Sequence, residues 1–219
     1  MDVKFSKLKR AEWAFLIGMF IYSAIPLLGG LVRVIEITFG LSIMPQNPRA
    51  IALPVPIVVH ILTSFVYCFF GSFQFVKSIR KMSPSGHQLL GKAVVICGLV
   101  SAVTGVWMTE FYEFPSELQG TSLYWTRLVL GSLMVIFIIC SMVLLKKRKF
   151  PTHGQYMIRA YAIAQGASTQ AIFGILWILV IGSELQGTGR EILMIGSWMF
   201  NIVSAEWVIR KIYFNRSAV

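Results

Sequence analysis

Six long apolar stretches, separated by short polar segments, make up almost the whole chain. A transmembrane α-helix needs about 20 mainly apolar residues, and each stretch is close to that length or longer. The segments between them are rich in proline, glycine and charged residues, which end helices. The pattern predicts an all-α, polytopic integral membrane protein, a single membrane domain over residues 1–219 with a core bundle of helices two to five. The six transmembrane helices are expected at about 13–38, 55–80, 89–109, 122–145, 155–182 and 191–209.

Polar and small residues follow one line along the second apolar stretch. They recur at intervals of three and four residues, so at 3.6 residues per turn they stay within roughly 40° of one line. If lipid covered this line, an imidazole, a phenol and an amide would stay unpaired in hydrocarbon, at roughly a few kcal/mol each. We therefore expect an interior polar seam that faces other helices or a cavity. Its members on this helix are His60, Ser64, Tyr67, Gly71, Gln74 and Ser78.

Residues on other helices match this interior polar seam. Thr169 and Gln170 in helix five and Arg127 in helix four are expected to join it, with Gln170 bonded to helix two. The third helix carries small residues on one face, which let a neighbouring helix approach closely. These are Gly91, Gly98, Ala102 and Gly105.

Charged residues near the helix ends predict ion pairs, since neighbours at i, i+3 and i, i+4 meet on a helix surface. The expected pairs of this kind are Arg33 with Glu36 and Glu206 with Arg210, and Arg127 is also expected to pair with Glu36 or Glu110.

Composition and charge fit the membrane interpretation. Only 13% of the residues are charged and 56% are hydrophobic, whereas soluble domains carry about 25% charged residues. The net charge of +11 does not indicate nucleic-acid binding, because the basic residues lie in short runs between apolar spans. With both termini in the cytoplasm of a bacterial inner membrane, 16 lysines and arginines face inward and four outward, which satisfies the positive-inside rule. The inner set is Lys4, Lys7, Lys9, Arg10, Lys77, Arg80, Lys81, Lys92, Lys146, Lys147, Arg148, Lys149, Arg159, Arg210, Lys211 and Arg216, and the outer set is Arg33, Arg49, Arg127 and Arg190.

Two histidines, His87 and His153, open helices at the inner surface and are candidate ligands of a metal, the iron of a b-type haem. Arg80, Lys92 or Arg159 would then lie near the haem propionates. The same residues also suit a polar pocket for a quinone head or a lipid phosphate, or two helix caps beside lipid head groups. His60 lies across the bilayer, so it cannot share a metal site with them. It is either a functional group on the seam or a neutral imidazole that bonds a neighbouring helix.

Residues 153–170, HGQYMIRAYAIAQGASTQ, resemble the signature H-x-x-W-M-x-R-x-Y-A followed by G-x-x-T-Q of a bacterial membrane-protein family catalogued as domain of unknown function 2306. VVHILTSFVYCFFGSFQF and GVWMT also match it, and the resemblance covers about residues 24–180. Tyr156 and Gln88 depart from the pattern. The resemblance supplies candidate residues rather than a mechanism, and its histidine-before-helix layout is similar at fold level to b561-type cytochromes. The candidates are His60, Gln74, Arg80, His87, Arg127, His153, Arg159 and Gln170.

Three functions remain open from the sequence. The first is a membrane redox module that holds one b-type haem and exchanges electrons with quinone. The second is a small-molecule or proton-coupled transporter along the interior polar seam, and the third is a non-enzymatic assembly or partner protein. The chain contains no phosphate-binding loop, nucleophile elbow or HExxH motif, which argues against a hydrolase or a kinase, and whether it is an enzyme stays open.

Overall fold

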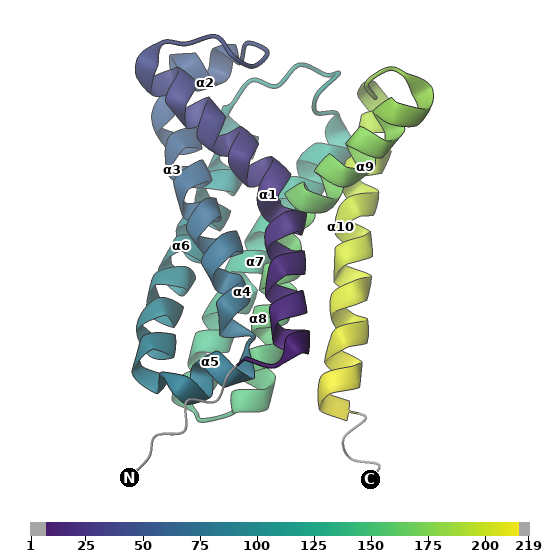
Figure 1. Cartoon of the computed structure of the whole chain (residues 1–219). Coiled ribbons are helices and arrows are strands. Elements are labelled where there is room, and N and C mark those ends of the chain that lie inside the picture. The colour runs from purple at the N-terminus through teal and green to yellow at the C-terminus, as the bar shows by residue number, and fades with distance from the viewer. Residues whose placement is uncertain (1–7, 215–219) are drawn as a thin grey trace, which may run out of the picture.

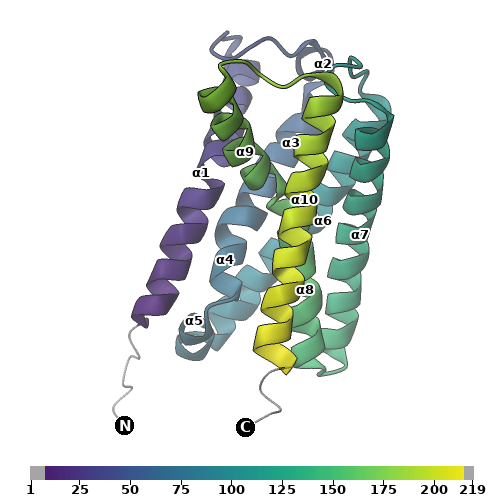
Figure 2. The ribbon, with the colours of Figure 1, turned by 90° about the vertical axis from the view of Figure 1, so that its right-hand side faces the viewer.

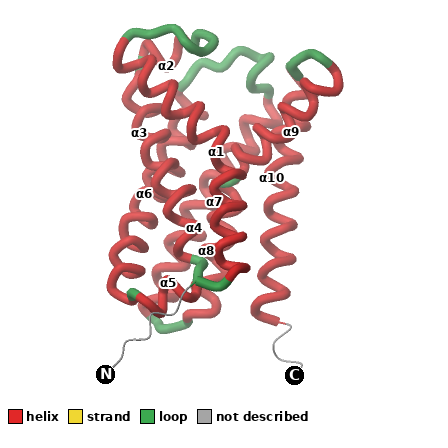
Figure 3. The backbone as a smooth tube through the Cα atoms, in the orientation of Figure 1, coloured by secondary structure: helices red, strands yellow, loops and turns green. Residues whose placement is uncertain are grey.

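The fold is a bundle of helices, seen in a computed structural model that describes residues 8–214. Six helical spans of this part of the chain are long and apolar enough to cross a membrane, which confirms the predicted fold class. We name the two ends of the bundle after the short helices that they carry, the α2 end and the α5 end (Figure 1). Most loops gather at these two ends (Figure 3). Lys4, Lys7 and Arg216, which entered the charge pattern, lie outside the described residues.

Several spans are built from more than one helix. The first, third and fourth spans are α1 (Arg10–Phe39), α6 (Pro84–Phe111) and α7 (Thr121–Lys146). The second span is α3 (Pro54–Phe65), the π-helix η1 (Val66–Phe70) and α4 (Gly71–Gln74). The fifth is α8 (Phe150–Ala164) and α9 (Gly166–Ile181), and the sixth is α10 (Gly187–Ile209) with the π-helix η2 (Arg210–Phe214). The short helices are α2 (Pro48–Ala52) and α5 (Lys77–Met82).

The second span ends earlier than its apolar pattern predicted. A continuous helix over 55–80 is wrong, because the helix ends at Gln74 and the backbone of Val76 is extended. α5 then starts in a new direction, and its Ser78 N–H donates a hydrogen bond of 3.0 Å to the Glu12 carboxylate of α1. A carboxylate at a helix N-terminus satisfies free N–H groups and suits the helix dipole. Ser78 is therefore buried against α1 and is not part of the interior polar seam.

The fifth span is interrupted at Gln165, so a continuous helix over 155–182 is also wrong. Side chains of α10 satisfy carbonyl groups beside the break. The Trp198 indole N–H donates to the Ile163 carbonyl at 3.1 Å, and the Asn201 amide donates to the Ala162 carbonyl at 3.2 Å. Gly166 has no side chain, and a Cβ there would overlap the Trp198 ring. Irregular backbone at membrane depth requires such internal partners.

Two helices begin earlier than predicted. α6 starts at Pro84 and α8 at Phe150, and each has a proline in its first turn, where the missing N–H costs no hydrogen bond. The Ser83 hydroxyl accepts a hydrogen bond from the Gly86 N–H and caps α6. As a result, His87 lies inside the first turn of a helix rather than before it.

The buried core comes from spans two to five, as predicted. α3 packs on α6, α6 on α7, and α7 on α8. α10 packs beside α8, and α1, at the left in Figure 2, packs on α3 and α9. The buried cluster consists of Tyr67, Cys68, Val94, Ala102, Leu130, Met134, Ile138, Ala160, Tyr161 and Ile163.

Candidate functional site

The interior polar seam of the second span lies against glycines of α6. The imidazole of His60 is over Gly105, the ring of Tyr67 is over Gly98, and the amide of Gln74 is over Gly91. A Cβ at Gly105 would lie 3.2 Å from the His60 ring, and one at Gly98 would overlap the Tyr67 ring. Both sets of residues recur every seven positions and the helices run antiparallel, so the three contacts occur in register.

His60 is fixed by hydrogen bonds to α6. Its Nδ1 lies 2.9 Å from the Ser101 carbonyl oxygen and 3.2 Å from the Thr104 hydroxyl. One turn further along, the hydroxyls of Ser64 and Ser101 are 2.6 Å apart. The polar groups in this half of the seam therefore have partners across the helix interface.

In the half of the seam nearer the α5 end, two polar groups lack such partners in the described chain. The Tyr67 hydroxyl and the Gln74 amide nitrogen are buried and have no hydrogen-bond partner among residues 8–214. Tyr67 is 1% exposed. Close packing therefore fills the seam at this level.

A cavity of about 410 Å³ opens in the α2-end half of the bundle. Its walls come from all six spans and are mainly apolar. On the second span the lining runs from Ile57 to Cys68 and includes His60 and Ser64, but neither Tyr67 nor Gln74. This volume falls in the range of small-molecule sites, which are about 300–1,000 Å³.

Two arginines and one phenylalanine lie at the α2 end of this cavity. The guanidinium carbon of Arg49 is 4.4 Å from the centroid of the Phe114 ring, and that of Arg127 is 5.1 Å from the same centroid. All three residues line the cavity. Cation–π contacts of this kind stabilise a guanidinium group without neutralising its charge.

The predicted pairing of Arg127 with Glu36 or Glu110 is wrong. Arg127 donates to the Gln119 side-chain oxygen instead. Glu36 is held by its neighbour Arg33 at 2.9 Å, as predicted, and Glu110 accepts a hydrogen bond from the Tyr124 hydroxyl. Within the described range, ion pairs form only in Arg33–Glu36 and in one further pair at the α5 end, so the two cavity arginines have no carboxylate partner.

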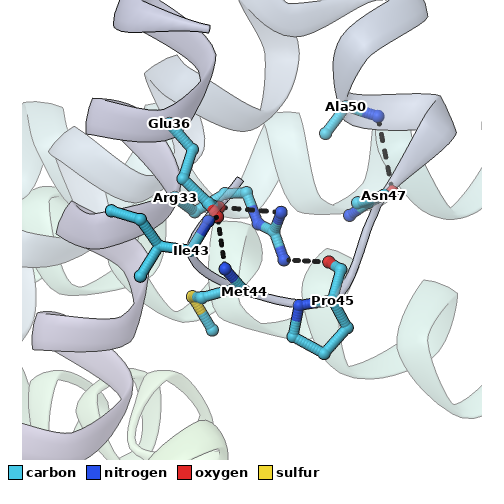
Figure 4. A network of polar contacts seen from close by, with 7 residues as sticks. All are labelled: Arg33, Glu36, Ile43, Met44, Pro45, Asn47 and Ala50. Carbon is cyan, nitrogen blue, oxygen red and sulfur yellow. Dashed lines mark hydrogen bonds and ion pairs between the residues drawn. The ribbon is translucent and has the colours of Figure 1, made fainter. Parts of the chain in front are cut away.

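The loop after α1 anchors Arg49 beside the cavity. The Glu36 carboxylate accepts hydrogen bonds from the N–H groups of Ile43 and Met44, and Arg33 donates to the Pro45 carbonyl at 2.8 Å (Figure 4). The loop then enters α2, where Asn47 caps the Ala50 N–H (Figure 4). Arg33 and Glu36 thereby neutralise each other beside the loop, and Arg49 is the cation of this segment that lines the cavity.

Burial changes the titration of two groups at this rim. Burial lowers the pKa of Arg49, but the ordinary value for arginine is so high that the side chain stays cationic near neutral pH. Burial raises the pKa of Tyr112. Its neutral hydroxyl donates to the Leu53 carbonyl at 2.6 Å, which ties the end of α6 to the start of α3.

His87 and His153 lie at the opposite end and do not line this cavity. Nδ1 of His153 is 2.7 Å from the Ser141 hydroxyl and 3.1 Å from its carbonyl oxygen. Nδ1 of His87 is buried with no partner in residues 8–214. Arg80 is exposed on α5, and both Arg80 and His153 lie close enough to His87 for their charges to interact.

Arg159 forms the second ion pair of the described chain, and its partner is Glu206 of α10. Nε and Nη2 of Arg159 lie 2.5 Å and 2.9 Å from the two carboxylate oxygens. The predicted pair of Glu206 with Arg210 is therefore wrong, because the carboxylate forms a bidentate contact between two helices instead of a contact along its own.

The fifth-span residues of the expected seam contact other helices. Thr169 bonds the hydroxyl of Tyr22 on α1 and, at 2.7 Å, the side-chain oxygen of Asn201 on α10. Gln170 donates to the Met194 carbonyl at 3.2 Å, so its predicted bond to the second span is wrong. Gln170 and Met194 line both the main cavity and a second one of about 340 Å³ that reaches Arg190.

The sequence reasoning did not select several residues of this region as site residues. Tyr22 and Asn201 are polar residues inside apolar spans, so the rule that selected His60 would also have found them. Gln165 is likewise a polar residue inside an apolar span. Its side-chain oxygen accepts a hydrogen bond of 3.1 Å from Ser23. Arg49 and Phe114 lie in or next to loops, where no periodicity marks a residue that faces a cavity.

Comparison with known proteins places the chain in a family. No curated protein and no solved structure matches it, so the looser likeness to b561-type cytochromes has no support from a known fold. A model of the family described as predicted membrane protein (DUF2306) matches residues 57–209, which is more than half of the chain and includes five of the six spans. The chain therefore belongs to the DUF2306 family of predicted membrane proteins.

Proposed function

We propose that the protein binds an amphipathic molecule with an anionic head group in the cavity at its α2 end. The observation that carries the proposal is the pair Arg49 and Arg127, which share the ring of Phe114 at a mainly apolar cavity and have no carboxylate partner in the described chain. An anionic head would lie between the guanidinium groups, and an apolar tail would follow the walls.

The charge arrangement favours such a ligand. Removing a guanidinium group from water is costly unless an anion or several acceptors replace the lost hydration. Arg127 has the Gln119 side-chain oxygen, and Arg49 has the Asn47 side-chain oxygen at 3.3 Å and the Glu113 backbone oxygen at 3.5 Å, all of which are neutral. A carboxylate or phosphate offers paired oxygens that match the guanidinium donors.

The shape of the bundle favours entry from the bilayer. α1 contacts α9, and toward the α2 end the two helices diverge (Figure 1). Pro26, Leu27 and Gly30 of α1 and Ala167 of α9 line the cavity at this divergence. Both helices are apolar enough to face lipid, so a molecule that reaches the cavity from the bilayer would pass between two apolar helices.

A lipid titration of the purified protein tests this proposal. Native mass spectrometry would compare binding of phosphatidylglycerol with binding of zwitterionic phosphatidylcholine of the same acyl chains. We expect tighter binding of the anionic lipid, and a loss of at least about tenfold in affinity for Arg49→Gln and for Arg127→Gln, since burying one fewer cation beside the anion costs more than about 1.4 kcal/mol. Arg10→Gln, on an exposed residue at the other end, is the matched control. Equal affinity for both lipids, or equal effects of all three substitutions, would refute the proposal.

Transport along the interior polar seam would extend this binding function. The cavity lining on the second span stops at Cys68, and the packed ring of Tyr67 lies beyond it. A transport cycle would therefore require this packed layer to open, whereas binding does not.

A second proposal is the redox module with one b-type haem and quinone as electron partner. The bond of His153 Nδ1 to Ser141 favours it, because it leaves Nε2 free as a metal ligand would need. The fit is incomplete, since Arg159 is held by Glu206 rather than free for a propionate. A Soret band in the purified protein that disappears in His153→Ala would support this proposal, and a colourless preparation from haem-replete cells would end it.

We also propose that the α5 end faces the cytoplasm of a bacterial inner membrane. Basic residues gather there, in α5, at the start of α1 and after α7, whereas the arginines of the α2 end number four. This asymmetry is the usual orientation signal of helical membrane proteins.

A further inference from the structure

The hydrogen bonds of His60 define what its second ring nitrogen offers to the cavity. The Ser101 carbonyl oxygen only accepts, and it lies 2.9 Å from Nδ1, so Nδ1 carries a proton. In the neutral ring Nε2 then holds a lone pair. Nε2 has no hydrogen-bond partner within residues 8–214, and His60 lines the cavity. The lining of the cavity thus combines a residue that offers an acceptor, His60, with two that offer donors, Arg49 and Arg127.

The acceptor and one of the donors, Arg127, lie at similar depth. His60 is six residues from the start of α3, and Arg127 is six residues from the start of α7, and both helices start at the α2 end. At 1.5 Å per residue, each lies about 9 Å inside its helix. Both side chains line the same cavity, so one head group can meet both.

The ring is best described as neutral. Arg49 and Arg127 already place two positive charges at this cavity, and a third in a mainly apolar wall is disfavoured. The nearest polar groups, Ser101 and Thr104, are uncharged. A neutral imidazole with a lone pair repels a bare anionic oxygen and attracts an O–H group.

We infer that the ligand head group combines an anion with a hydroxyl donor, and that His60 accepts a hydrogen bond from this hydroxyl. This inference rests on the proposed binding function and specifies its ligand. A membrane lipid with a phosphodiester and a free hydroxyl, as in a phosphoglycerol head group, has both features. The phosphodiester meets Arg49 and Arg127, and the hydroxyl meets Nε2 of His60.

Two lipids of equal charge test the inference. Phosphatidylglycerol and phosphatidylmethanol share the phosphodiester, but only the first carries a head-group hydroxyl. In native mass spectrometry of the full chain with matched acyl chains, we expect a three- to tenfold preference for phosphatidylglycerol, the size of one hydrogen bond. His60→Leu should abolish the preference, whereas His60→Gln, which keeps an acceptor, should retain part of it.

The outcomes separate this inference from the proposed function. Equal binding of the two anionic lipids by the unmodified chain, both tighter than phosphatidylcholine, would overturn the role of His60 and leave the anion site in place. If neither anionic lipid binds more tightly than phosphatidylcholine, the proposed function itself fails. If His60→Leu weakens both anionic lipids equally, the residue acts as a cation or a structural support, and the inference is refuted. The comparison of the two lipids on the unmodified chain decides the question even if a variant does not fold.

Discussion

The hydroxyl of Tyr161 donates a hydrogen bond of 2.6 Å to the carbonyl oxygen of Cys68. Cys68 lies in the π-helix of the second span, and Tyr161 lies one turn before the break in the fifth. A π-helix shifts the backbone hydrogen-bond pattern and leaves carbonyl groups in need of other partners. The irregular segments of the two spans are thus joined directly, at the depth where the cavity lining on the second span ends.

Tyr161→Phe should destabilise the protein by about 1–2 kcal/mol, because it leaves a buried carbonyl without its partner. For a chain of this size, that corresponds to a melting temperature lower by several degrees. Thermal unfolding in detergent measures the shift. Tyr156→Phe is the control, since the Tyr156 ring packs on Phe137 and the hydroxyl forms no hydrogen bond within residues 8–214. Equal shifts for the two variants would contradict the role assigned to Tyr161.

Gly98→Ala should destabilise the bundle, because the added methyl group overlaps the ring of Tyr67. Overpacking of this kind costs about 1–3 kcal/mol. Gly174→Ala is the control on α9, where a Cβ has no atom within 4 Å. There the better helix propensity of alanine should leave stability equal or slightly raised. A melting temperature unchanged by Gly98→Ala would show that the second span and α6 do not pack as closely as described.

The pair Arg159–Glu206 should couple α8 to α10 by about 0.5–1 kcal/mol. The side chains are 26% and 38% exposed, so solvent screens the interaction despite its bidentate geometry. A double-mutant cycle with Arg159→Gln and Glu206→Gln measures the coupling free energy. High salt should reduce it. A coupling near zero at low salt would mean that the contact does not stabilise the bundle, and Arg210 would then be tested as the alternative partner.

The proposed orientation predicts a cytoplasmic C-terminus. A green fluorescent protein fused there should fluoresce, since this reporter folds on the cytoplasmic side, whereas a fusion within the loop 182–186 at the α2 end should stay dark. The reverse result would place the α2 end, with its cavity, toward the cytoplasm. It would leave the ligand chemistry unchanged but reverse the side from which the cavity is approached.

The number of spans and the composition of the core could be predicted because both depend on long apolar stretches of the sequence. An uninterrupted apolar stretch does not reveal where the helix within it breaks, however. The break at Gln165 depends on Trp198 and Asn201 from another span, which take up the freed carbonyl groups. The turn at Val76 depends likewise on Glu12 of α1. The residues around each break do not indicate these distant partners.

The candidate site could also be predicted only in part. His60 stands out because an imidazole at membrane depth needs a partner, and the glycines of α6 mark where that partner lies. The predicted interaction partner was wrong where more than one partner lay within reach of a side chain. Glu206 had a basic residue on its own helix, yet the side chain contacts Arg159 across an interface. Loop geometry places Arg49 beside Phe114, and helical periodicity does not predict the path of a loop.

The seven-residue match between the second span and α6 has a mechanical consequence. His60, Tyr67 and Gln74 each fit over a glycine, so sliding one helix by a single turn would bring all three side chains against larger residues at once. These two spans are thereby locked in one register and would move as a single rigid unit. Movement of α1 against α9 would leave this register intact, and labels on those two helices are the ones that would report it.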